Sequence, residues 1–213
     1  MTDTAETDFR AAAGVDLRDW FRFEVGRSLP LTGGGVTLSV AAYIGQAEWE
    51  RFKVDLVGSD FRMTGQPEAV PSLADIHIPD VEQHGYRAYP LVDHVADKVA
   101  ATFERYGSTE SPSSRYKDLI DLVAIVKGAS LPADAQKVAL ESEAKRRGIT
   151  LPDSFSVPDQ DRWEKGYKAA AKKARMTEAE TLAEALAIVT PFTDPLLDGT
   201  ASGTWEPTLG RWA

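Results

Sequence analysis

The sequence contains no cysteine, so disulfide bonds and thiolate metal sites are excluded. It has no apolar run long enough to cross a bilayer, and its N-terminus, MTDTAETDFR, has no apolar signal core. These absences predict a protein without a membrane partner, and a chain free of cysteine suits the reducing cytoplasm. No segment repeats with a period of about 20–50 residues, so a repeat architecture is not expected.

The signatures of several enzyme classes are missing too. Neither a P-loop string nor a G-x-S-x-G string occurs. The histidines are His77, His84 and His94, and their spacing matches no histidine metal motif, so we interpret them as solvated or core residues. A hydrolase or a metalloprotein of an unrelated class is therefore poorly supported.

The composition is that of a folded globular chain. Of the 213 residues, 43% are hydrophobic and 27% are charged, and this length is enough to bury a sizeable core in one domain. The net charge of −9 argues against a uniformly basic surface for nucleic acid. Charge is segregated, however, because the run KGYKAAAKKAR at residues 165–175 contains five basic side chains and no acidic one.

The first half of the chain shows the period-two alternation of β-strands. In residues 50–57 the apolar side chains share one face, whereas Arg51, Lys53 and Asp55 share the other. We expect strands at residues 20–25, 35–45, 50–57, 74–79 and 86–90.

The second half shows the spacing of amphipathic helices. Thr177 and Glu180 resemble a capping box at the start of the last helix. Strands followed by helices indicate an α+β fold, with a strand-rich core at residues 1–89 and a helical part at residues 90–213 packed on it as one compact unit. We expect helices at residues 90–107, 112–128, 132–147, 162–174 and 177–189.

Four polar side chains beside the apolar faces are candidates for a functional site. Asp55 is either a carboxylate on a solvated strand face or a metal ligand that projects from the sheet. Lys98 lies at the edge of an apolar stripe, where a lysine usually extends to solvent but can also hold a phosphate. Asp118 and Asp121 are three residues apart and project from one side of a helix, where paired acids are more often surface charge. Taken singly, each residue is more simply interpreted as solvated charge.

Taken together, these segments resemble a known family. The string YPLVDHVADKVAATFERYG, a short break and SSRYKDLIDLVAIV resemble the AbiEii/AbiGii family of nucleotidyltransferase toxins, which includes the MenT toxins. The segments FRAAAGVDLRDWFRFEVG and FKVDLV also resemble this family, so the likeness covers roughly residues 8–127. The residues that match the family pattern are Asp97, Lys98, Arg115, Lys117, Asp118, Leu119, Asp121 and Leu122.

The resemblance implies a nucleotidyltransferase-like mixed sheet and a toxin of a toxin–antitoxin pair. Such a toxin transfers nucleotides from an NTP to an RNA acceptor such as the tRNA 3′ end, with Mg²⁺. By the same resemblance Asp55 is a catalytic carboxylate and a Mg²⁺ ligand. Lys98 and Arg115 are expected to hold the nucleotide, and Asp118 with Asp121 to orient basic groups or the acceptor. The implied partners are an NTP, tRNA or another RNA acceptor, and a cognate AbiEi-type antitoxin.

One part of the family pattern is absent. The first signature of the family is Gly-Gly or Gly-Ser followed by an Asp-x-Asp strand, and nothing before residue 20 matches it. We therefore expect an incomplete core, through either truncation or reduction. The alternative function is that of a non-catalytic member that only binds antitoxin or tRNA. We expect NTP binding through Lys98 to survive better than turnover.

The basic run near the end of the chain predicts an RNA-binding surface. Lys165, Lys168, Lys172 and Arg175 recur at helical spacing, so they form one stripe that can follow a phosphate backbone. A solvated helix face is the alternative interpretation of the same pattern.

Overall fold

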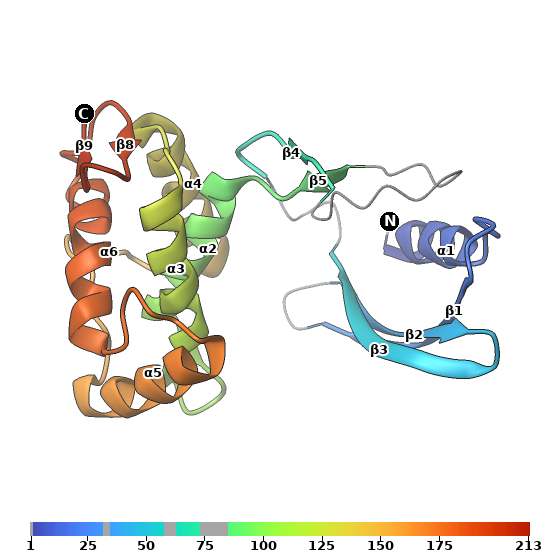
Figure 1. Cartoon of the computed structure of the whole chain (residues 1–213). Helices are drawn as coiled ribbons and strands as arrows, with labels where there is room; N and C mark the ends of the chain where they lie inside the picture. Colours follow the sequence, from blue (N-terminus) through green and yellow to red (C-terminus); the bar gives the residue numbers. More distant parts are fainter. Residues whose placement is uncertain (1, 32–34, 58–62, 73–84) are drawn as a thin grey trace. The chain divides into compact units, whose positions relative to one another are not determined.

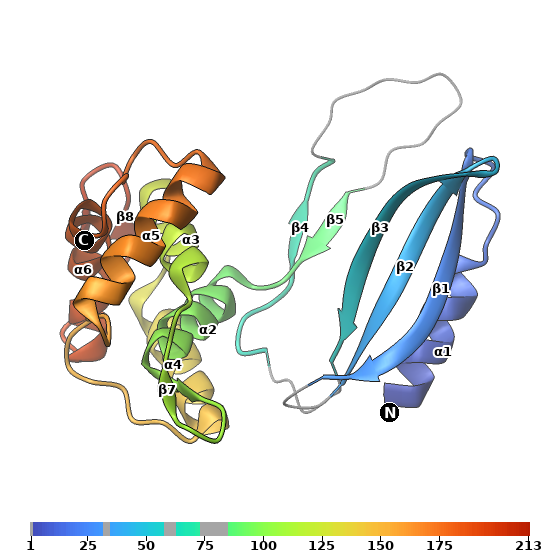
Figure 2. The ribbon, with the colours of Figure 1, turned by 90° about the horizontal axis from the view of Figure 1, so that it is seen from below.

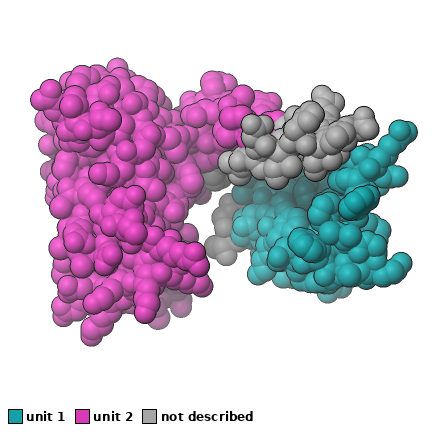
Figure 3. Space-filling view, viewed as in Figure 1, with its two compact units in different colours: residues 1–62 teal, residues 63–213 magenta. Residues whose placement is uncertain are grey.

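The structure, a computed structural model, describes residues 2–31, 35–57, 63–72 and 85–213. The chain divides into two compact units, an N-terminal unit of residues 1–62 and a helical unit of residues 63–213, which are coloured separately in Figure 3. The strand expected at residues 74–79 lies outside the described residues, as do His77 and His84.

The N-terminal unit is one helix on a three-stranded antiparallel sheet. Helix α1 (Thr2–Ala13) lies along one face of the sheet and contacts β1 and β3 (Figures 1 and 2). The guanidinium of Arg10 ties the helix to the sheet by donating hydrogen bonds of 2.8 and 2.7 Å to the carbonyls of Val25 and Gly26. The strands, in the order β1-β2-β3, are β1 (Phe21–Pro30), β2 (Val36–Ile44) and β3 (Ala47–Leu56).

The strand register separates an apolar face from a polar face. Val40 lies between Val25 and Phe52 on one face, and both Val40 and the neighbouring Leu38 are buried. The pair Thr37 and Asp55 lies one residue beyond Leu38 and its partner Val54, so these two side chains point to the other face. The expected face of Asp55 is therefore the observed one.

The helical unit begins with two short strands and continues as a bundle of five helices. The short strands β4 (Glu68–Val70) and β5 (Tyr86–Ala88) pair antiparallel. Helix α2 packs against α3 and α4, and α3 packs against α5 and α6 (Figure 1). The helices are α2 (Leu91–Phe103), α3 (Tyr116–Gly128), α4 (Ala133–Arg147), α5 (Gln160–Ala174) and α6 (Leu182–Leu197). Two further hairpins are β6 (Arg105–Tyr106) with β7 (Ser111–Pro112), and β8 (Trp205–Glu206) with β9 (Arg211–Trp212).

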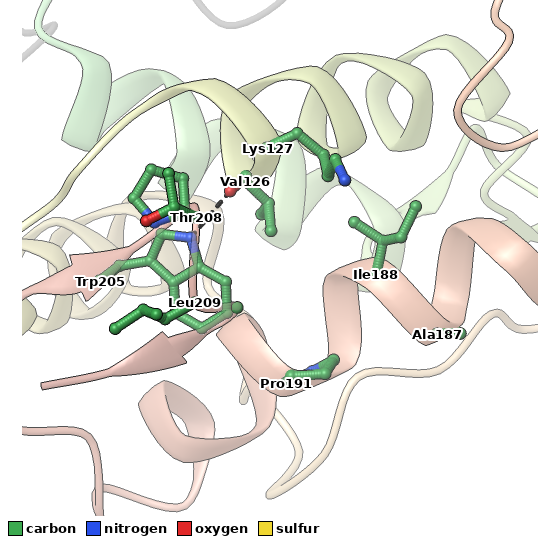
Figure 4. Close-up of a pocket in the computed structure, with 10 residues that line it drawn as sticks. Val126, Lys127, Ala187, Ile188, Pro191, Trp205, Thr208 and Leu209 are labelled. Atoms are coloured by element: carbon green, nitrogen blue, oxygen red, sulfur yellow. Dashed lines mark hydrogen bonds between the residues drawn. The ribbon is translucent and has the colours of Figure 1, made fainter.

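The C-terminal hairpin closes the core of the helical unit. Trp205 is buried and its indole Nε1 donates a 2.8 Å hydrogen bond to the carbonyl of Val126 in the last turn of α3 (Figure 4). The rings of Phe192 and Trp212 stack with centroids 5.1 Å apart. A shallow pocket of about 300 Å³ opens between this hairpin, α3 and α6, with Lys127 at its edge (Figure 4).

The α+β class is confirmed, and four details differ from the sequence-based expectations. The described strands pair only antiparallel, in small separate sheets instead of one mixed sheet. The helix expected to reach Gly107 ends at Phe103, because the chain turns into the β6–β7 hairpin. The last capping box is formed by Thr181 and Glu184, one turn after the expected pair, because residues 175–181 form a loop that is held by a hydrogen bond from Tyr167 of α5 to Ala179. Helix α1 was not expected.

The division into units also differs in position from the change in secondary structure. The chain becomes helical at Leu91, close to the boundary expected at residue 90, whereas the compact units divide between residues 62 and 63. Packing of the strand-rich part and the helical part as one compact unit stays a prediction. Among the helices that the structure describes, none has the length and apolar composition needed to span a membrane.

Candidate functional site

A buried lysine on α2 faces two aspartates on α3. The side chain of Lys98 is 7% exposed, and its Nζ lies 3.4 Å from Asp118 Oδ1 and 2.5 Å from Asp121 Oδ2. The two aspartates are one helical turn apart, so both carboxylates project from the side of α3 that faces α2. The helical unit thus brings together three of the candidate residues at one point.

The two carboxylates differ in their environment. The Asp118 side chain is 13% exposed, whereas that of Asp121 is 50% exposed. Asp118 Oδ2 is fully buried and accepts no hydrogen bond from the described residues, although Arg115 Nη1 lies 3.7 Å away. A buried carboxylate oxygen with no donor is costly, so this atom is a ready acceptor for a ligand hydroxyl or amine.

Arg115 is the exposed cation of the cluster. Its side chain is 51% exposed, and its guanidinium lies over the ring of Tyr106, 5.5 Å from the centroid. A guanidinium offers five donors in a planar fork that matches phosphate oxygens. Arg115 is therefore free to turn one edge towards a bound anion while its face stays on Tyr106.

The neighbours of Lys98 on α2 are His94, one turn before it, and Thr102, one turn after it. Desolvation lowers the pKa of His94 from its ordinary value, and the positive charge of Lys98 lowers it further. The Thr102 hydroxyl donates a 3.1 Å hydrogen bond to the carbonyl of Lys98. A lowered pKa keeps His94 neutral at pH 7, so the fixed positive charges of the cluster are those of Lys98 and Arg115.

Helix α5 holds the start of α3, and with it Arg115 and Asp118. Trp163 Nε1 donates a 2.9 Å hydrogen bond to the Ser113 carbonyl, and the Trp163 ring meets the edge of Tyr116 with centroids 5.1 Å apart. Gly166 leaves the space that the Tyr116 ring occupies. Sequence reasoning missed these supports, since they depend on which helices pack together.

Helix α4 fixes α2 from its other side through Arg147. The Arg147 side chain is 9% exposed and forms ion pairs with Asp97, Glu104 and Glu143. Asp97 directly precedes Lys98 in the family pattern. Its observed partner is Arg147, in the interface between α2 and α4, so Asp97 helps to hold α2 in position.

Asp55 lies in the N-terminal unit, near the end of β3. It is exposed, and its Oδ1 accepts a 2.6 Å hydrogen bond from the Thr37 hydroxyl on β2. Its expected convergence with Lys98, Asp118 and Asp121 stays a prediction, because the two residues Asp55 and Lys98 belong to different units.

The described residues do not fit a site for two Mg²⁺ ions. Mg²⁺ is held by carboxylate oxygens together with water and substrate phosphates. In the ranges that the structure describes, Asp, Glu and His side chains nowhere gather in a group of three or more that could hold a metal ion. Asp55, with the Thr37 hydroxyl beside it, supplies one carboxylate ligand. A Mg²⁺ contact at Asp55 therefore stays a prediction.

The basic stripe forms one exposed side of α5. Lys165, Lys168, Lys172 and Arg175 are all exposed, as expected for residues spaced three and four apart on the side opposite the buried Trp163. Its last three members line a groove of about 440 Å³ at the junction of α5 and α6.

The Lys98 cluster is electrically balanced and open on one side. Lys98 and Arg115 contribute two positive charges, and Asp118 and Asp121 contribute two negative charges. An incoming anion must therefore compete with a carboxylate for the ammonium, and the half-exposed Asp121 is the carboxylate that can turn to solvent. The arrangement can bind a phosphate with Lys98 and Arg115 while Asp118 keeps Lys98 in place.

The chain matches a known protein family. The family described as nucleotidyl transferase AbiEii toxin, type IV toxin–antitoxin system, matches residues 2–188. Among curated proteins none matches the chain. The matched range includes the N-terminal unit and the helical unit as far as the middle of α6, with Lys98, Arg115, Asp118 and Asp121 inside it. The chain therefore belongs to the AbiEii nucleotidyl transferase toxin family of type IV toxin–antitoxin systems.

Proposed function

We propose that the chain transfers nucleotides from an NTP to an RNA acceptor, and that Lys98 holds the triphosphate. The single observation that carries this proposal is the burial of the Lys98 ammonium between Asp118 and Asp121. Burial of a charged ammonium is unfavourable, and lysines are rarely this buried unless their charge is paired. Membership of the family supplies a reason for the buried charge, because its reaction needs a cation against phosphate oxygens.

The site works by exchange of one anion for another. Asp121 contributes a carboxylate that is half exposed, so it can leave Lys98 when a phosphate arrives. Asp118 is more buried and stays, which keeps the ammonium aimed at the phosphate. Arg115 adds a second, bidentate contact from the loop before α3.

Asp118 also has the position of a proton acceptor. Its Oδ2 is buried and receives no hydrogen bond from the described residues. The attacking hydroxyl of an RNA acceptor can donate to this oxygen, which aligns the hydroxyl and accepts its proton as the bond to phosphorus forms. The bond from the α-phosphorus of the NTP to its bridging oxygen breaks as the new bond forms, and pyrophosphate departs while paired with Lys98 and Arg115.

Membership of the family supports the proposed acceptor and antitoxin. A toxin of this class has an antitoxin partner and uses a nucleotide. We propose tRNA, at its 3′ end, as the acceptor and a cognate AbiEi-type protein as the antitoxin. Asp55 as a Mg²⁺ ligand is a separate part of the proposal, and no step above depends on it.

A second candidate function is binding without turnover. It is favoured by one observation, the lack of a group of three metal-binding carboxylates in the described ranges. In that case the chain binds NTP through Lys98, and antitoxin or tRNA elsewhere, but incorporates no nucleotide.

Incubation of the full chain with labelled NTPs, Mg²⁺ and total tRNA distinguishes the two. Transfer predicts labelled tRNA that disappears with Lys98→Met and Arg115→Ala but persists with Lys127→Met, an exposed lysine elsewhere on α3. Equilibrium dialysis with the same NTPs should show affinity reduced about tenfold or more by Lys98→Met, since a hydrogen bond to a charged group contributes roughly 1.5–3 kcal/mol. NTP affinity unchanged by both site variants would overturn the proposed role of Lys98.

A further inference from the structure

The groove at the junction of α5 and α6 has cations on one wall and a fixed loop on the other. It has a volume of about 440 Å³. Its cationic wall is the C-terminal end of α5, and its opposite wall is the segment from Met176 to Thr181. The lining residues are Lys168, Ala171, Lys172, Arg175, Met176, Thr177, Glu180 and Thr181.

The charge of this groove is strongly one-sided. Three of its lining residues are basic and one, Glu180, is acidic, within a chain whose net charge is −9. Lys165 extends the same row one turn towards the start of α5. The row extends from Lys165 to the C-cap residue Arg175, ten residue steps or about 15 Å at the rise of an α-helix. A single phosphate group covers only part of that length, whereas a nucleic acid strand presents a new phosphate every ~3.4 Å of helix axis.

The opposite wall is held rigidly by hydrogen bonds from both helices. The Tyr167 hydroxyl, on the buried side of α5, donates a 2.9 Å hydrogen bond to the Ala179 carbonyl. Glu184 Oε2 accepts from the backbone N–H groups of Glu180 and Thr181, at 2.9 Å each. The groove is therefore built before any ligand arrives. Because Glu184 already occupies these amides, an anion in the groove must bind to the side chains of Lys168, Lys172 and Arg175.

We propose that this groove binds the phosphodiester backbone of RNA, without regard to base sequence. The inference rests on the proposed function, since it assigns a docking surface to the RNA acceptor of that reaction. Lysines act as point charges and read no base, and the row offers them at successive positions along one side of a helix. Glu180 lies on the wall opposite the cationic row, where its negative charge repels a phosphate and favours release of the RNA.

An acidic protein segment is a weaker candidate for this groove. The groove has a row of charges and no aromatic side chain among its lining residues, whereas protein interfaces are centred on apolar and aromatic anchors. Binding of a phosphodiester backbone requires only the row of positive charges.

Binding of a labelled oligouridylate by the full chain, measured over a series of salt concentrations, tests the proposal. The triple variant Lys168→Gln, Lys172→Gln, Arg175→Gln should bind about tenfold or more weakly and lose about 2–3 units of the slope of log affinity against log salt. Glu180→Gln should bind roughly two- to fivefold more tightly, as expected for removal of one exposed repulsive charge. Tighter binding is an outcome that damage to the fold does not produce.

The matched control carries the same loss of charge at other exposed positions of the helical unit, namely Lys127→Gln, Lys145→Gln and Arg211→Gln. It should keep the slope and affinity of the unchanged chain to within about twofold. Equal losses in both triple variants, or no effect of Glu180→Gln, would overturn the groove as an RNA site. If the groove variant keeps RNA affinity but loses neutralisation by antitoxin, the occupant is the acidic protein segment instead. Failure of the proposed function is separate, because it appears as unchanged NTP affinity in Lys98→Met.

Discussion

The ring of Tyr116 occupies the space where Gly166 has no side chain. A Cβ built on Gly166 would lie less than 3.0 Å from three atoms of that ring, closer than real Cβ atoms approach their neighbours. Tyr116 is the first residue of α3, between Arg115 and the turn that carries Asp118. The close approach of α5 to α3 therefore sets the position of two residues of the candidate site.

Gly166→Ala should destabilise the protein and disturb the site at the same time. The added methyl group must displace Tyr116, and overpacking of this kind typically costs about 1–3 kcal/mol. We expect a lower urea midpoint with an unchanged slope, together with weaker NTP binding. The control is Gly128→Ala at the end of α3, where a Cβ meets nothing within 4 Å and should leave both quantities nearly unchanged. Equal midpoints for the two variants would show that the Tyr116 contact is not constraining.

Substitutions at Asp118 and Asp121 should have different effects, because Asp118 stays paired with Lys98 whereas Asp121 leaves it when a phosphate binds. Asp118→Asn alters the more buried carboxylate and should cost roughly 2 kcal/mol in the free energy of unfolding, whereas Asp121→Asn should cost less than about 1 kcal/mol. Asp121→Asn should bind NTP more tightly than the unchanged chain, because it removes the carboxylate that competes with the phosphate. Weaker NTP binding in Asp121→Asn would refute the exchange of anions at Lys98.

His94 should titrate below its ordinary pKa of about 6.5, and Lys98 should be part of the cause. Desolvation is the first cause of the lowered pKa and the charge of Lys98 is the second. Lys98→Met should therefore raise the pKa of His94 without restoring its full ordinary value. The imidazole proton shifts of the three histidines, followed by NMR across pH 4–8, measure this change directly.

The sign of the linked stability follows from the same shift. Because the folded state binds the His94 proton less readily than the unfolded state, acid favours unfolding. The contribution of His94 to stability is therefore complete above about pH 6.5 and falls as the pH drops towards the lowered pKa. His94→Gln should flatten the stability profile in this window, and a steeper profile would contradict the assignment.

Arg147 should matter more for stability than its neighbour Arg146. Arg147 is 9% exposed and joins Asp97 of α2, and Glu104 just after that helix, to Glu143 of α4, whereas the Arg146 side chain is 35% exposed. Arg147→Met removes the cation of Glu104 and leaves Asp97 and Glu143 paired with the more exposed Arg146, so it should cost about 3 kcal/mol. Arg146→Met, the control, should cost less than about 1 kcal/mol by the same denaturation measurement.

The sequence predicted elements and faces better than it predicted contacts. The alternation around Asp55 gave its strand and the face that it shares with Lys53, since side-chain direction has a period of two in any strand. The spacing of Asp118 and Asp121 predicted that both carboxylates project from the same side of α3. Neither pattern could name Lys98 as the common partner from residues alone, because that depends on the packing of α2 beside α3. The family resemblance supplied the grouping.

The parts that escaped prediction are those with weak local patterns. Helix α1 has Phe9 as its one large apolar residue, with small alanines at the other apolar positions, so its apolar stripe is weak. The capping box was displaced by one turn, because Thr177 and Thr181 are each followed three residues later by a glutamate. The hydrogen bond from Tyr167 to Ala179 holds the segment between them outside a helix, and it links residues that no local pattern connects.

The C-terminal hairpin should be a measurable part of the stability of the helical unit, although it lies beyond the matched range of residues 2–188. Trp205 is 1% exposed, and its indole satisfies the carbonyl of Val126, one of the last-turn carbonyls of α3 that have no partner within the helix. Trp205→Phe removes this hydrogen bond and part of a buried ring, so we expect a loss of roughly 2–4 kcal/mol.

Trp212→Phe is the matched comparison for this prediction. Trp212 is half-buried, and its Nε1 donates a longer 3.1 Å hydrogen bond to the Phe192 carbonyl. The same exchange of ring at Trp212 should cost about 1 kcal/mol. Urea denaturation followed by circular dichroism measures both variants without relying on the altered tryptophans. If Trp205→Phe unfolds at the same midpoint as Trp212→Phe, the cap on α3 does not contribute, and the hairpin stabilises the unit only by covering apolar surface.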